Sequence, residues 1–200
     1  TEVINISGTS GFSGLNTDYC INESASVLNG SPAGGVFTGS GITGNTFDPS
    51  SAGVGNHEIN YVYTIVSGET CKDTSALTTN VHALPTVSFS PVRDLYNVDE
   101  TPVTLTGNPA VPAPDGVFTG NGISDNLDGT ASFLPDLAGT VGSPHDISYI
   151  YTDANGCTDT SRLSIHVEDA TVSIEGYNIS QIYCIDDLTD TVTTDDISLT

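Results

Sequence analysis

The chain has 200 residues, of which 25 are acidic and 3 are basic, so its formal net charge at pH 7 is -22. A chain this acidic cannot neutralise a phosphate backbone, which excludes nucleic acid as an expected partner. No run of about 18 apolar residues is present, so no direct membrane insertion is expected. Hydrophobic residues make up 36% of the sequence, which is enough for a packed core and disfavours a disordered chain.

Five blocks of sequence occur twice in the same order, about 85 residues apart, which indicates a tandem duplication. The paired blocks are LNGSPAG with LTGNPAVPAPD, GGVFTGSGI with GVFTGNGI, FDPSSAG with FLPDLAG, HEINYVYT with HDISYIYT, and CKDTSALTTNV with CTDTSRLSIHV. A third copy begins with TVSIEGYNISQIYCIDD. The sequence therefore predicts one module at residues 1–84, a second at 85–168, and the incomplete start of a third at 169–200. The chain begins in mid-pattern, and we expect it to be a piece of a longer protein.

Short alternating segments inside each module predict strands. The first copy alternates apolar or aromatic residues with polar or smaller ones at Ile59, Tyr61, Tyr63 and Ile65. Ile147, Tyr149 and Tyr151 repeat the pattern in the second copy, so one face of each segment is expected to point to a core. Gly-containing turns separate these segments, and no helical period is found. Several short strands per module predict an all-β fold of tandem immunoglobulin-like β-sandwich modules.

The segment GSGITG (39–44) matches the G-x-G-x-x-G pattern of dinucleotide-binding loops, which requires a strand before it and a helix after it. No helical pattern follows Gly44, and the second copy reads GNGISD, with Asp125 in place of the third glycine. We therefore expect a glycine-rich turn at a strand end, and no nucleotide cofactor.

No enzyme activity and no catalytic residue are predicted. His57 and His145 occupy the same repeat position before a tyrosine-rich strand, where a structural hydrogen bond is expected. No G-x-S-x-G elbow accompanies them.

The order Y-C, L-x-G-x-P, G-x-F-x-G-x-G-I, F-x-P-x-x-A-G, I-x-Y-x-Y-T and G-C-x-D-T resembles the PKD-like/Ig-like tandem repeats of Bacteroidota cell-surface proteins. It is most similar to the modules of gliding-motility adhesins of the SprB type, which the type IX secretion system exports. The resemblance covers essentially the whole chain and implies stalk and adhesive units without catalytic residues. One departure is Asn97, which stands where the family pattern and the first module have a cysteine, Cys20.

Four cysteines allow three pairings. The repeat pattern favours a Cys20–Cys71 disulfide inside the first module, closing a loop of about 50 residues worth roughly 4 kcal/mol. Because Asn97 replaces the matching cysteine, Cys157 is expected to lack an equivalent bond. A Cys157–Cys184 bond is the alternative, and no C-x-x-C spacing supports zinc.

Two further sites follow from short patterns. Three residues lie around a turn at a spacing that hard, oxygen-seeking cations favour: Asp153, Asn155 and Asp159. They predict a calcium site, and the alternative is that these residues only stabilise the turn. The tripeptide DTV (190–192) resembles the acid-Thr-apolar pattern of Bacteroidota O-glycosylation, with Thr191 as acceptor.

The sequence thus predicts a non-catalytic array on an extracellular, cell-surface protein, which few lysines, four cysteines and many serines and threonines also favour. The modules would act as a stalk or spacer with weak multivalent adhesion. Their partners would be neighbouring modules of the same chain, and extracellular polysaccharide or solid surfaces. The alternative is a carbohydrate-binding or accessory module of a secreted hydrolase.

Overall fold

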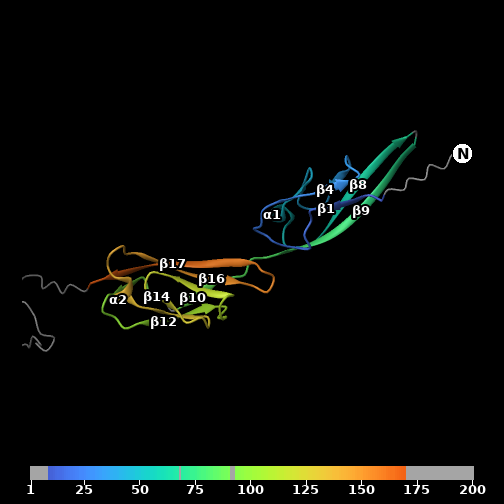
Figure 1. The fold of residues 1–200 in the computed structure, drawn as a ribbon. Helices are drawn as coiled ribbons and strands as arrows, with labels where there is room; N and C mark the ends of the chain where they lie inside the picture. Colours follow the sequence, from blue (N-terminus) through green and yellow to red (C-terminus); the bar gives the residue numbers. More distant parts are fainter. Residues whose placement is uncertain (1–8, 68, 91–92, 170–200) are drawn as a thin grey trace, which may run out of the picture. The chain divides into compact units, whose positions relative to one another are not determined.

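The computed structural model describes residues 9–67, 69–90 and 93–169 (Figure 1). The described chain is nearly all β, which confirms the predicted all-β class. The strands of the first repeat are β1 (Gly11–Ser13), β2 (Asp18–Cys20), β3 (Ser26–Val27), β4 (Asn29–Ser31), β5 (Val36–Thr38), β6 (Ile42–Thr43), β7 (Thr46–Phe47), β8 (Gly55–Ser67) and β9 (Glu69–His82). Those of the second repeat are β10 (Ser88–Ser90), β11 (Leu95–Asn97), β12 (Val103–Asn108), β13 (Gly116–Gly120), β14 (Ile123–Asp125), β15 (Thr130–Phe133), β16 (His145–Thr152) and β17 (Thr158–Glu168).

The two repeats share one strand topology. One sheet has the order β2-β9-β8-β5 in the first repeat and β11-β17-β16-β13 in the second. In both sheets the first listed pair is parallel and the other two pairs are antiparallel. The remaining strands of the second repeat form a sheet of order β10-β12-β15-β14, and their counterparts in the first repeat form the β1-β4 and β3-β7-β6 sheets.

Each repeat has its own hydrophobic core, built from the inward positions of these sheets. Tyr61 on β8 and Tyr149 on β16 occupy equivalent positions in the two cores, and their side chains are fully buried. Phe37 lies opposite Tyr61 in the register, as Phe118 lies opposite Tyr149. The alternating pattern read from the sequence is therefore the pattern that fills both cores.

The glycine-rich segment is a turn between two strands in both repeats. Gly41 and Gly122 both adopt φ +74°, a left-handed conformation that favours glycine. A side chain at Gly41 would also lie 2.6 Å from the Asp48 carbonyl oxygen. A strand follows the turn in each case, β6 or β14, so the turn lacks the helix that a dinucleotide-binding loop requires.

Two short helices occupy segments where the sequence indicated only turns: α1 (Pro49–Ala52) and α2 (Pro135–Ala138). Proline starts each helix, and a glycine with positive φ ends it. The carbonyls of these glycines, Gly53 and Gly139, accept hydrogen bonds of 2.7 Å from Nε2 of His57 and His145. The structural role predicted for both histidines is confirmed.

No helix in the described ranges is long and apolar enough to cross a membrane. The predicted third repeat, Cys184 and Thr191 lie outside the described residues.

Candidate functional site

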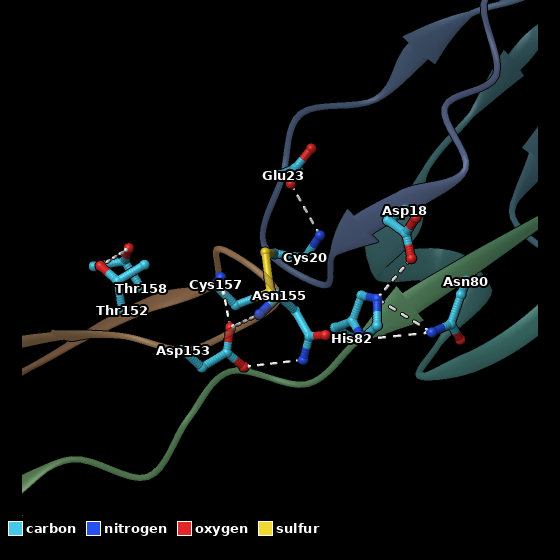
Figure 2. The surroundings of a disulfide bond; sticks show 10 residues. All are labelled: Asp18, Cys20, Glu23, Asn80, His82, Thr152, Asp153, Asn155, Cys157 and Thr158. Carbon is cyan, nitrogen blue, oxygen red and sulfur yellow. Dashed lines mark hydrogen bonds and ion pairs between the residues drawn. A yellow bond between two sulfur atoms is a disulfide. The ribbon is translucent and has the colours of Figure 1, made fainter. Parts of the chain in front are cut away.

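The cysteines pair differently from the sequence prediction: Cys20 is bonded to Cys157, with Cα atoms 5.5 Å apart (Figure 2). The predicted Cys20–Cys71 bond is wrong. Cys20 lies beside His82 at the far end of β9 from Cys71. At roughly 3.3 Å per residue, the strand from Cys71 to His82 is about 36 Å long, far beyond the Cα separation of about 7 Å that a disulfide can bridge.

The expectation that Cys157 lacks a partner inside the two complete repeats is also wrong, and so is its alternative pairing with Cys184. The Cys157 side chain is fully buried and Cys20 is 7% exposed, so solvent has little access to either sulfur. Cys71 is an exposed free cysteine on β9. The disulfide therefore joins the first sequence repeat to the second and lies outside both hydrophobic cores.

The first repeat holds Cys20 through three contacts at the end of β2. Tyr19, beside it, is buried, and its hydroxyl accepts a hydrogen bond from the Asn16 N–H. The Cys20 N–H donates to Glu23 Oε1 at 3.0 Å, and the following Ile21 N–H donates to the His82 carbonyl at 2.9 Å. These contacts fix the strand end that carries Cys20 against β9.

The second repeat holds Cys157 at the end of a tight turn between β16 and β17. Asp153 Oδ1 accepts hydrogen bonds of 2.9 Å from the N–H groups of Asn155 and Cys157. Burial raises the pKa of Asp153, but the two backbone donors, the Asn155 side chain and nearby His82 together outweigh it, so the net pKa lies below the ordinary value. The carboxylate therefore remains ionised and locks the turn that presents Cys157.

Carboxylates surround the disulfide. Asp18, Glu23 and Asp153 lie around it, and we refer to these three residues as the acidic rim (Figure 2). Asp18 Oδ1 lies 2.9 Å from Nε2 of His82, and this hydrogen bond holds the Asp18 pKa below its usual value. The site thus combines a buried cross-link with negative charge at its edge.

The residues of the calcium hypothesis are not gathered into a cation site. Asp153 uses its carboxylate on the turn described above, and Asn155 Nδ2 donates to its second oxygen at 3.3 Å. Asp159 lies on β17 opposite Tyr151, and its Oδ1 accepts from the Thr160 N–H. Among the described residues, no three His, Cys, Asp or Glu side chains form a group able to hold a metal. Calcium binding remains a prediction, which the melting temperature with and without millimolar calcium tests.

Aromatic side chains contribute to the cores more than to the surface. None of the exposed large hydrophobic residues in the described part is aromatic. The Tyr61 hydroxyl, at the edge of a pocket of about 450 Å³, donates to the Pro32 carbonyl and accepts from the Gly35 N–H. Phe12, Tyr63 and Tyr151 are partly buried against the cores, so the described residues offer little fully exposed aromatic surface for stacking on sugars.

The comparisons with known proteins find similarity among solved structures, one of which is an adhesin. No family model matches the chain, and no curated protein matches it. Among solved structures, the chain is similar to a Ca²⁺-stabilised adhesin that helps an Antarctic bacterium reach out and bind ice. The TM-score is 0.43 at 15% identity, over 82% of this chain and 49% of that chain. The chain thus spans about half the length of that adhesin chain.

Proposed function

We propose that the chain is a non-catalytic structural segment of an extracellular surface protein, in which covalently joined β-sandwich modules act as a stalk or spacer. The boundaries 1–84 and 85–168 are part of this proposal. The observation that carries it is the Cys20–Cys157 disulfide, because it connects two copies of one fold and contributes to neither hydrophobic core. A stalk has to hold its modules together, and this bond does so directly.

Redox chemistry supports the extracellular location. Structural disulfides persist in oxidising compartments and are rare where thiols are kept reduced. The net charge of -22 supports the stalk role, because like-charge repulsion keeps neighbouring acidic modules from collapsing onto one another. Within this proposal, the sequence resemblance favours a Bacteroidota adhesin of the gliding-motility type, exported by type IX secretion.

The partners proposed for such a segment are neighbouring modules of the same chain, with surfaces or polysaccharide bound weakly and repeatedly. Multivalency would give such weak contacts their strength. The alternative, a carbohydrate-binding module of a secreted hydrolase, loses support because the four most deeply buried tyrosines form the cores: Tyr19, Tyr61, Tyr96 and Tyr149.

Surface labelling tests the proposal. An antibody raised against the chain is expected to label intact cells of the producing organism, and protease treatment of intact cells should remove the signal. Labelling that appears only after the cells are permeabilised would contradict an extracellular stalk. A glycan array probed with the chain separates the alternative, since strong binding to one sugar would favour a carbohydrate-binding module.

A further inference from the structure

We propose that the Cys20–Cys157 disulfide is a mechanical shunt, meaning a covalent shortcut that transmits tension from Cys20 directly to Cys157. Nearly all strands of both sandwiches lie between these two cysteines and are bypassed by the load. This inference rests on the proposed stalk function, since a stalk between a cell and a surface is loaded at its ends. Its basis is the position of the bond in the topology: Cys20 ends β2 and Cys157 immediately precedes β17, with a sequence separation of 137 residues.

The load path follows from covalent connectivity. Tension applied on either side of the described region reaches Cys20 through β1 and β2, crosses the disulfide, and leaves through β17. Every other strand, from β3 to β16, lies inside the closed loop and carries no tension through its backbone. Both hydrophobic cores draw most of their residues from this protected loop.

β17, the last strand in the load path, has little length left to yield. β17 (Thr158–Glu168) is pulled at its two ends, and a β-strand is already extended at about 3.3 Å per residue. It is also held on both sides, by antiparallel pairing with β16 and parallel pairing with β11. Tension along β17 therefore tightens an extended segment and does not peel it from its sheet.

The surroundings of the bond favour its survival. Thiol–disulfide exchange begins with attack by a thiolate on a sulfur atom. The fully buried Cys157 and the 7% exposed Cys20 leave little room for that attack. The acidic rim adds electrostatic repulsion toward an incoming anionic thiolate, because the lowered pKa values of Asp18 and Asp153 keep these carboxylates ionised (Figure 2). A load-bearing cross-link needs this resistance to reduction.

Single-molecule pulling on the full chain tests the shunt. A Cys71→Ser/Cys184→Ser background removes competing disulfides and leaves the Cys20–Cys157 bond in place. The protein is attached by its two ends and unfolded under oxidising conditions, then again with a strong reductant. Because 137 residues separate the two cysteines, reduction is expected to release roughly 45–50 nm of additional contour length.

A matched variant provides the control. Adding Cys20→Ser to the same background should give the long extension with or without reductant. The shunt is overturned if the Cys71→Ser/Cys184→Ser protein also extends fully under oxidising conditions. Failure of the shunt leaves the surface-labelling result unchanged, and an intracellular location leaves the pulling result unchanged, so the two proposals fail separately.

Discussion

Replacing Cys20 and Cys157 together by serine is expected to lower the free energy of unfolding by about 5 kcal/mol. The bond joins two cysteines that are 137 residues apart in the sequence. For a closed loop of this size, the chain-entropy relation gives a stabilisation of about 5 kcal/mol. The effect comes from the unfolded chain, which gains freedom when the cross-link is lost. Urea denaturation followed by circular dichroism measures it as a lower transition midpoint.

Cys71→Ser is the matched control for this double variant. Cys71 is exposed and free, so its replacement should change the free energy of unfolding by less than about 0.5 kcal/mol. The opposite ranking, with Cys71→Ser strongly destabilising and the double variant neutral, would indicate that Cys71 takes part in the structural disulfide.

Gly30→Ala is expected to destabilise the first repeat by about 3 kcal/mol through overpacking. An alanine Cβ at Gly30 would lie 2.1 Å from Cζ of the Tyr61 ring, and that ring is 1% exposed. The ring cannot move aside, because Gly35 lies against it as well and its hydroxyl is bonded to the Pro32 carbonyl. Thermal or urea unfolding of the variant measures the loss.

Gly11 offers a control in the same two-stranded sheet, since β1 and β4 pair antiparallel. A Cβ at Gly11 would meet no atom within 4 Å, so Gly11→Ala should be neutral or slightly stabilising. Equal effects of Gly11→Ala and Gly30→Ala would contradict the packing of Tyr61 against Gly30. Gly107→Ala extends the test to the second repeat, where the added Cβ would lie 2.2 Å from the Tyr149 ring.

Local patterns predicted the local structure well. The period of two in HEINYVYT and HDISYIYT placed Ile59, Tyr61, Ile147 and Tyr149 inward, and all four are buried. The same pattern placed Tyr63 and Tyr151 inward, and these two are only partly buried against the cores. The duplicated glycines predicted a turn and not a nucleotide-binding loop, because the sequence after them shows no helical pattern. These features depend on neighbouring residues, which the sequence displays directly.

The two short helices were not predicted, because four residues are too few to show a helical period. Their signals were present but subtle, namely a proline that starts each helix and a glycine that ends it. Asp48 adds a side-chain cap to α1 by accepting from the Ser50 N–H, whereas Leu134 provides no side-chain cap for α2.

The disulfide was mispredicted because its geometry depends on a long-range parallel pairing. Cys20 is placed by the contact of β2 with the end of β9, which no local pattern reveals. The repeat itself held a clue: Asn97 lies beside Glu168 as Cys20 lies beside His82. The N–H groups of Cys20 and Asn97 both donate to a glutamate three residues later. Only the cysteine is missing there, as expected for a junction bond that is not part of the core of each repeat.

Disulfide mapping under non-reducing conditions tests the central claim most directly. The free thiols of the full chain are blocked, the chain is cut by a protease specific for acidic residues, and linked peptides are identified by mass spectrometry. The structure predicts one peptide pair joining Cys20 to Cys157, with Cys71 in a different peptide. A peptide pair joining Cys20 to Cys71 would contradict the covalent junction between the repeats, and with it the proposed stalk and its mechanical shunt.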